Sequence, residues 1–362
     1  MANPRLLSSF GIIAAALGLA YIPIPGAQQR LVVVSGTELQ EPLQALEARF
    51  EQANPNIQID LEFVGSRDII NRYIDDDFDA NPTILIPANG ELLQEVSDRW
   101  QGADSPFYGA PEPIAKTLLV GVAWSDRGQV LFPKGEFDWG RVEAALNASV
   151  WPAIGGQNDW GSFDLVITDP GRSNSGQLAL GLWAKSESGG NLSPSTLGQP
   201  QIQDLFSLVK RSVYQPPRST DTLLQEFIAR GPNDADVALV YESIALNRWE
   251  QSAATQNKPY QIYYLNPSIE TVSTAAIATR DVGRAEAEAA NEFLDFLKAS
   301  QQQETFVQFG FRPAAANLDL VNVPGSPWAA SIPGAAVDPP PATETPSQQI
   351  LTEIVRLWQR AS

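Results

Sequence analysis

Apolar runs and amphipathic stretches alternate along the first seventy residues after position 30. The stretch 31–36 is a β-branched run that ends in Ser-Gly, and 38–55 places an apolar residue at about every third or fourth position. Such a pair is typical of a strand followed by a helix with one buried face. Strand patterns at 57–64 and 82–87 follow, each with a helical pattern behind it. Three strand–helix units in succession predict a mainly parallel sheet covered by helices.

The same alternation continues to about residue 312. Apolar runs that predict further strands lie at 116–125, 163–170, 235–243, 260–267 and 272–280. Among the helical patterns between them, 220–230 begins with Thr220 or Asp221 as the expected N-cap and stops at Gly231. Thereafter 313–345 is rich in Pro, Ala and Ser, which predicts a linker with little to pack. The final stretch, 346–362, predicts an amphipathic helix that docks on the main body, because an isolated helix of this length is marginal in water.

The N-terminal segment 1–29 has the layout of an export signal. Arg5 precedes an uncharged apolar run from Leu6 to Ile22, which is followed by prolines and small residues. An uncleaved membrane anchor is the alternative, since 17 apolar residues are at the short limit for a membrane span. In both cases we expect the folded part outside the cytoplasm, in the periplasm or its equivalent.

The amino-acid composition limits the catalytic and metal-binding chemistry that this chain can carry out. The 362 residues contain no His and no Cys, which removes the commonest general base, the commonest metal ligands and any disulfide. We therefore expect no catalytic activity, no cofactor and no metal site. The formal charge of −18 repels nucleic acid, so none is expected as a partner. The length favours two domains, because single cores seldom grow beyond about 250–300 residues.

Several predicted strands end in loops that carry hydroxyls or glycines and then open a helix. They are Ser35-Gly36-Thr37, the loop 65–68, the loop 169–176 and Tyr241-Glu242-Ser243. In open α/β sheets such strand ends hold ligands, because helix N-termini present unpaired N–H groups that favour an anion. Each loop alone could be an ordinary helix cap. The density of Ser and Asn at 173–176 favours ligand binding there, so replacing Ser173 and Ser175 by Ala is expected to weaken binding more than folding.

The opening VVVSGTELQEPLQALEARFEQANPNIQIDLEFVGS, the mid-chain ITDPGRSNSG, and the later ALVYESIAL and FVQFGFRPA together give the chain a family resemblance. Over 31–314 it resembles bacterial extracytoplasmic solute-binding proteins of the two-lobed type II class, in the group that includes molybdate and phosphate binders. The resemblance implies an α/β fold with helices on both faces of mixed, mainly parallel sheets, and with hinge crossovers between lobes. One lobe would comprise 30–115 and 271–312, the other 116–267. Two departures are the missing lipoprotein cysteine and the tail beyond 312.

The resemblance also implies a ligand site where the loops face each other across the cleft. Carried over, it implicates Ser35, Thr37, Ser66, Arg67, Arg172, Ser173, Asn174, Ser175 and Tyr241. The expected function is capture of a small ligand, with an oxyanion favoured over a sugar or an amino acid. The protein would act as a monomer and deliver this ligand to a membrane permease of the ABC type.

Other functions stay open at this point. A membrane-anchored ligand sensor would retain the apolar run at Leu6–Ile22. An exported serine hydrolase rests on Ser207 and Lys210, which have S-x-x-K spacing but lie in a helical pattern. A ferric site could use the adjacent Tyr263 and Tyr264, although neighbours on a strand point to opposite faces.

Overall fold

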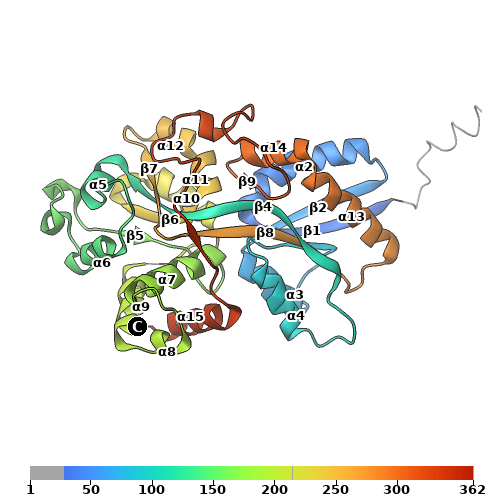
Figure 1. Cartoon of the computed structure of the whole chain (residues 1–362), viewed down its shortest axis with the longest axis horizontal. Coiled ribbons are helices and arrows are strands. Elements are labelled where there is room, and N and C mark those ends of the chain that lie inside the picture. The colour runs from blue at the N-terminus through green and yellow to red at the C-terminus, as the bar shows by residue number, and fades with distance from the viewer. Residues whose placement is uncertain (1–27, 214, 362) are drawn as a thin grey trace, which may run out of the picture.

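The computed structural model describes residues 28–213 and 215–361, arranged as two lobes around a single curled sheet (Figure 1). The predicted export signal or anchor at 1–29 falls outside the described residues except for its last two positions. Within the described ranges, no helix is both long enough and apolar enough to cross a membrane. The predicted two-lobed α/β fold with a mixed sheet is confirmed.

The smaller lobe is built from the strand–helix units that the N-terminal pattern predicts. Its elements are β1 (Gln29–Gly36), the 3-10 turn η1 (Thr37–Leu39), α2 (Gln40–Ala53), β2 (Ile57–Val64), α3 (Ser66–Asp75), β3 (Ile84–Ile86), α4 (Glu91–Arg99), α13 (Arg284–Lys298) and α14 (Ser300–Gln308). Strands β2, β1 and β3 run parallel in that order. Leu31 and Val33 of β1 are fully buried beneath Leu43, Leu46 and their neighbours in the helices, which is the face that the apolar spacing predicts.

Two long antiparallel strands, β4 (Phe107–Trp124) and β8 (Ser268–Ala278), run through both lobes (Figure 1). The first part of β4, up to Ala115, lies in the core of the smaller lobe, whereas Leu118 onward lies in the other core. Strand β8 returns from the core of the larger lobe, which contains Ile269, to the core of the smaller lobe, which contains Ala275. Because β8 pairs antiparallel with β3, and β4 pairs antiparallel with β6 (Val237–Tyr241), these strands give the sheet its mixed character.

The larger lobe holds most of the remaining elements. They are α5 (Ser125–Leu131), α6 (Trp139–Ala148), η2 (Trp151–Ile154), η3 (Asn158–Trp160), β5 (Leu165–Val166), α7 (Asn174–Glu187), α8 (Pro194–Leu197), α9 (Pro200–Ser212), α10 (Thr220–Arg230), η4 (Gly231–Asn233), β6 (Val237–Tyr241), α11 (Glu242–Asn247), α12 (Trp249–Thr255) and β7 (Tyr260–Tyr264). The mid-chain strand is shorter than its apolar run predicts, because only Leu165 and Val166 pair with β6. The N-cap of α10 is Ser219, not Thr220 or Asp221: its hydroxyl accepts from the Thr222 N–H. This leaves the Asp221 carboxylate available for other contacts.

The C-terminal segment packs more than its composition suggests. It contains β9 (Arg312–Pro313), η5 (Pro327–Ala329), β10 (Ala342–Thr343) and α15 (Gln348–Arg360). The expectation of little packing at 313–345 is wrong for its apolar side chains, because Leu320, Val323, Trp328 and Ile332 are buried in the core of the larger lobe. Helix α15 follows and docks against α7 and α9 through Ile354 and Trp358.

Candidate functional site

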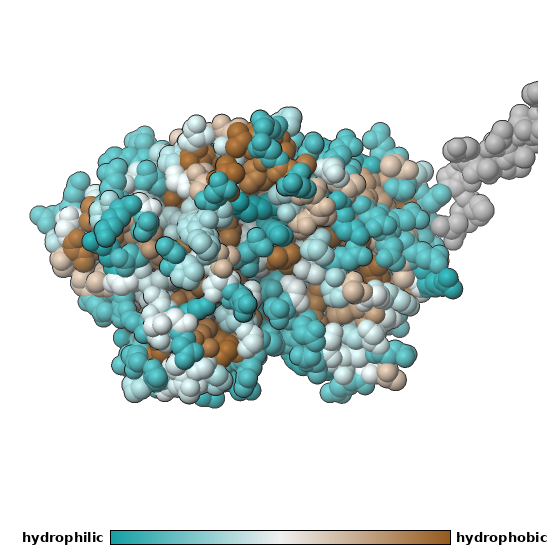
Figure 2. Space-filling view, in the orientation of Figure 1, coloured by the Kyte–Doolittle hydropathy of each residue, from teal (hydrophilic) through white to brown (hydrophobic). Residues whose placement is uncertain are grey.

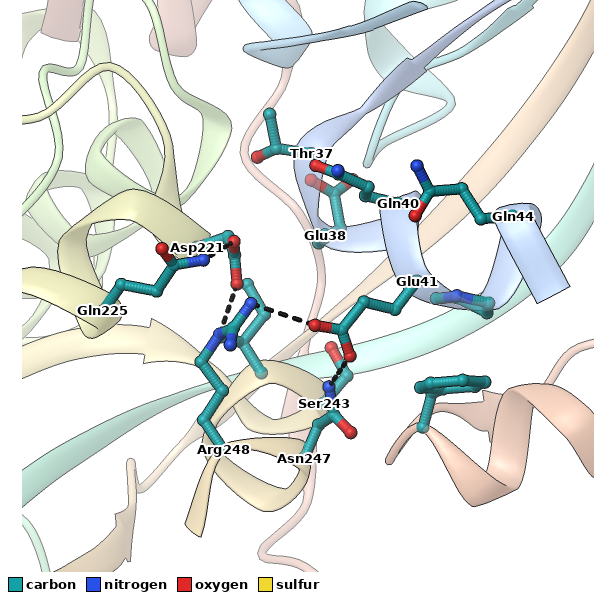
Figure 3. A pocket seen from close by; sticks show the side chains of 13 residues that line it. Thr37, Glu38, Gln40, Glu41, Gln44, Asp221, Gln225, Ser243, Asn247 and Arg248 are labelled. Carbon is teal, nitrogen blue, oxygen red and sulfur yellow. Dashed lines mark hydrogen bonds and ion pairs between the residues drawn. The ribbon is translucent and has the colours of Figure 1, made fainter. Parts of the chain in front are cut away.

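A small cavity of about 190 Å³ lies where the two lobes meet (Figure 3). The smaller lobe contributes η1, the start of α2 and one residue after α14, and the larger lobe contributes α10 and α11 with the residue that follows α11. The lining residues are Thr37, Glu38, Gln40, Glu41, Pro42, Gln44, Asp221, Gln225, Ser243, Ile244, Asn247, Arg248 and Phe309. Polar side chains from both lobes therefore face one shared, partly open space.

Arg248 organises one wall of this cavity. Its Nε donates to Asp221 Oδ1 at 2.6 Å, and its Nη2 reaches Glu41 Oε1 of the opposite lobe at 3.2 Å (Figure 3). Asn247 adds a second bond between the lobes, from its Nδ2 to Glu41 Oε2 at 2.6 Å. The carboxylates of Asp221 and Glu41 raise the pKa of Arg248, against the opposing effect of burial. The guanidinium is thus already shared by two carboxylates.

Glu38 differs from the other carboxylates of the lining. It follows the Ser-Gly-Thr end of β1, and its side chain folds back over Gly36, so closely that a Cβ added there would lie 2.2 Å from its Oε1. The residue is 9% exposed, and Oε1 has no hydrogen-bond partner among the described residues. Burial, with a smaller contribution from the Asp221 charge, raises the pKa of Glu38 to about 7, although a bond to its own backbone opposes this. Within 28–213 and 215–361, Glu38 is therefore a buried acceptor without an ion-pair partner.

Thr37 is the one predicted site residue that lines the cavity itself. Ser35, two residues earlier in β1, is fully buried, and its hydroxyl donates weakly to the carbonyls of Gly36 at 3.3 Å and Ile86 at 3.4 Å. Ser66 is also buried, where its hydroxyl accepts from the Ala88 N–H at 3.0 Å. The structure thus gives both serines hydrogen-bond partners within the protein, and neither lines the cavity.

The two predicted arginines are both paired with carboxylates. The buried guanidinium of Arg67 is held by Glu95 of α4, with Nη2 3.2 Å from Oε1. Arg172 forms a bidentate pair with Asp68 of the other lobe, at 2.6 and 3.1 Å. The backbone N–H of Arg67 also donates to the Arg172 carbonyl across the lobe boundary, at 3.3 Å. These contacts join the loop at 65–68 to the loop at 169–176.

The mid-chain loop forms a hydroxyl cluster within the larger lobe. The Ser175 hydroxyl lies 2.9 Å from that of Thr168, 3.1 Å from that of Ser173 and 2.6 Å from that of Thr220. Ser173 is the N-cap residue of α7, but its side chain makes no capping bond. Gly176 has a structural role, since an added Cβ would lie 2.3 Å from the Thr168 carbonyl oxygen. The ligand-binding role of the two serines stays a prediction.

Asn174 and Tyr241 meet behind the cavity. Asn174 Nδ2 donates to the Tyr241 hydroxyl at 2.9 Å, and both residues are 1% exposed. Burial, with a smaller effect of the nearby Glu38 charge, raises the pKa of Tyr241 well above its usual range. Asn174 Oδ1 and the hydroxyl of Ser243, directly after β6, have no hydrogen-bond partner within 28–213 and 215–361. Three buried polar atoms of this lobe boundary, Glu38 Oε1, Asn174 Oδ1 and Ser243 Oγ, therefore lack a hydrogen-bond partner in the described residues.

Sequence reasoning missed Glu38, Asp221, Asn247 and Arg248. From the sequence alone, a charged residue that follows a strand or lies in a helix is expected to be exposed. These four side chains are buried or half-buried only because the two lobes meet around them. The one available signal was the position of Glu38, directly after the hydroxyl loop Ser35-Gly36-Thr37.

The side chains on which the hydrolase and ferric-site hypotheses depend have other partners within the protein. Lys210 of the S-x-x-K tetrad donates to the Trp358 carbonyl at 3.3 Å and lies over the indole ring. Tyr263 bonds Gln261 at 2.8 Å, whereas Tyr264 bonds Glu242, so the two hydroxyls lie in different surroundings. In the described part of the chain, no group of three or more His, Cys, Asp and Glu is placed to hold a metal ion.

A family model and several solved structures match this chain. A family model described as bacterial extracellular solute-binding protein matches residues 31–312. The fold is similar to that of a periplasmic thiamin binding protein, at 14% identity and a TM-score of 0.65, over 92% of this chain and 96% of that one. A ferric binding protein from Campylobacter jejuni matches at 14% identity and a TM-score of 0.61, over 91% and 98%. The sulfate-binding protein SubI from Mycobacterium tuberculosis H37Rv matches at 18% and 0.55, over 79% and 88%. None of the curated proteins matches the sequence.

Proposed function

Because the chain belongs to the family of bacterial extracellular solute-binding proteins, we propose that it captures one small solute between its lobes. Proteins of this family bind small ligands and deliver them to ABC-type membrane permeases; they are binding proteins rather than enzymes. The proposal for this chain is a periplasmic monomer that binds its solute without chemical change and presents it to such a permease.

One observation carries this proposal: the cavity at the lobe boundary is lined by polar groups of both lobes, and two buried atoms of its lining residues have no partner in the part of the chain that the structure describes. Glu38 Oε1 belongs to the smaller lobe and Ser243 Oγ to the larger one. Leaving a buried polar atom unpaired costs about 1–3 kcal/mol. A bound solute that paired with both atoms would recover that cost only when the lobes are closed.

The fold supports a hinge mechanism. Only β4, β8 and the C-terminal segment link the lobe bodies covalently, and each strand crosses between the cores over a few residues. Non-covalent bonds between the lobes, such as Arg172–Asp68 and Asn247–Glu41, are polar and partly solvent-accessible. Bending of the strands at these crossings would break the bonds between the lobes without exposing either hydrophobic core. The solute would therefore be released when the lobes reopen.

The ligand class suggested by the sequence was an oxyanion, with sugars and amino acids as alternatives. The names of similar structures add thiamin, iron and sulfate as ligands of those proteins. The polar lining of the cavity supports a small polar solute from this range. A cavity of about 190 Å³ is smaller than the roughly 300–1,000 Å³ of typical ligand pockets, which favours a ligand of few heavy atoms.

A ligand panel tests the proposal. The full chain is mixed with sulfate, phosphate, molybdate, simple sugars, amino acids, small amines, thiamin and ferric citrate, and melting temperature and calorimetric heat are recorded. We expect one class to raise the melting temperature and to reduce the radius of gyration in small-angle X-ray scattering. Arg248→Gln, which removes the bridge across the cavity, should weaken that response. Absence of any binding across the panel, or binding without compaction, would contradict capture between the lobes.

A further inference from the structure

The ionisable side chains that line the cavity carry more negative than positive charge. Three carboxylates line it, from Glu38, Glu41 and Asp221, against the single guanidinium of Arg248. That guanidinium already binds two of the carboxylates, so it offsets one of their two negative charges and is not free for a ligand. The remaining carboxylate, Glu38, is the buried one without a hydrogen-bond partner for Oε1 in the described structure.

An oxyanion fits this arrangement poorly. Sulfate, a fully deprotonated oxyanion, brings only acceptor oxygens, which cannot pair with Glu38 Oε1 while Glu38 is ionised. It would also lie beside a surplus of negative charge in a partly desolvated space, where like charges repel strongly. The arginines that could offset this charge, Arg67 and Arg172, are paired with Glu95 and Asp68.

We propose that the ligand is a small organic cation, and that its ammonium group donates hydrogen bonds to the Glu38 carboxylate and the Ser243 hydroxyl. This inference rests on the proposed function and names the ligand class for the same cavity. The two acceptors come from opposite lobes, so an ammonium group between them ties the lobes together in the closed form. Figure 3 shows Glu38 on the side of the cavity formed by η1, Ser243 beside Asn247 on the side formed by α11, and Arg248 held to Asp221 and Glu41.

The surroundings of Glu38 make this binding dependent on pH. The titratable and charged groups near it are Asp221 at the start of α10, Tyr241 at the end of β6, Glu41 in α2 and, bridging Asp221 and Glu41, Arg248. With a pKa of about 7, Glu38 is largely protonated at pH 6 and largely ionised at pH 8. A cation binds only the ionised form, so its affinity should rise about tenfold between these pH values and its binding should release a proton below pH 7.

Isothermal titration calorimetry at pH 6 and pH 8 tests this inference. Ethanolamine and 1,4-diaminobutane serve as ammonium probes, ethane-1,2-diol as an uncharged probe of similar size, and sulfate as the oxyanion. We expect both amines to bind the full chain, about tenfold more tightly at pH 8, and the other two probes to bind far more weakly. Glu38→Gln, which keeps the shape and removes the charge, should lose at least tenfold in amine affinity and lose its pH dependence.

A matched control and distinct outcomes keep the two proposals separate. Glu292→Gln makes the same charge change on the exposed face of α13 and should leave both the affinity and its pH dependence intact. Binding of sulfate, a sugar or a metal ion without binding of amines overturns the inference but leaves capture between the lobes standing. Amine affinity that is equal at both pH values, or equal in Glu38→Gln, also overturns it. Failure of the whole panel overturns the proposed function itself.

Discussion

Replacing Glu38 by Gln should stabilise the ligand-free protein by an amount that grows as the pH rises from 4.5 and levels off above 7. Glu38 is buried with no partner for Oε1 among the described residues, so its ionised form is penalised in the folded state. Its pKa is about 7 in the folded protein against an ordinary 4.5. Between these two values the folded state keeps a proton that the unfolded state has released. Keeping this proton contributes to the free energy of unfolding. The contribution is fully present below pH 4.5 and is lost as the pH rises through 7.

The magnitude follows from the pKa difference. Each pKa unit corresponds to about 1.4 kcal/mol, so ionising Glu38 costs the folded protein about 3 kcal/mol at pH 8. Gln resembles the protonated carboxyl in shape and never ionises. The variant should therefore match the native protein near pH 4.5 and exceed its free energy of unfolding by up to about 3 kcal/mol at pH 8.

Urea unfolding at pH 5, 6, 7 and 8 measures this difference, with tryptophan fluorescence and circular dichroism recorded in parallel to check that the lobes unfold together. Glu292→Gln supplies the control for a change of net charge and should show a difference that is small and constant with pH. A variant that is no more stable than the native protein at pH 8, or a gain that is equal at every pH, would show that the folded protein compensates the Glu38 charge.

Two further changes examine the loops that sequence reasoning selected. Ser175→Ala removes a buried hydroxyl that contacts Thr168 and Thr220, so the free energy of unfolding measured in urea should fall by about 1–3 kcal/mol. Intact stability with a large loss of ligand affinity would instead show that the Ser175 hydroxyl binds the ligand. Asp68→Asn removes the partly exposed ion pair with Arg172 across the lobe boundary, worth about 1 kcal/mol or less, so the open form should gain up to about fivefold in population. Small-angle X-ray scattering without ligand should then show a larger radius of gyration, and an unchanged radius would mean that other contacts hold the lobes.

Much of the fold could be predicted from local patterns. The spacing of apolar residues identifies β1, α2, β2 and α3 nearly to the residue, because a helix or strand with one buried face imposes its period on the sequence. The hydroxyl-rich strand ends were likewise visible, and all of them lie at or beside the lobe boundary. The family resemblance over Leu31–Ala314 rests on these same stretches.

The chemical character of the site was decided by tertiary structure. Arg67 and Arg172 look like anion ligands in the sequence, but the folded chain places Glu95 and Asp68 against them. Glu38 looks like an exposed helix residue, but the larger lobe covers it and raises its pKa. Ser175 looks like a ligand contact, but Thr220, 45 positions away, takes its hydroxyl. Pairing and burial of charges depend on which distant segments meet, and no local period in a single sequence records that, whereas strands and helices are specified by the residues that form them.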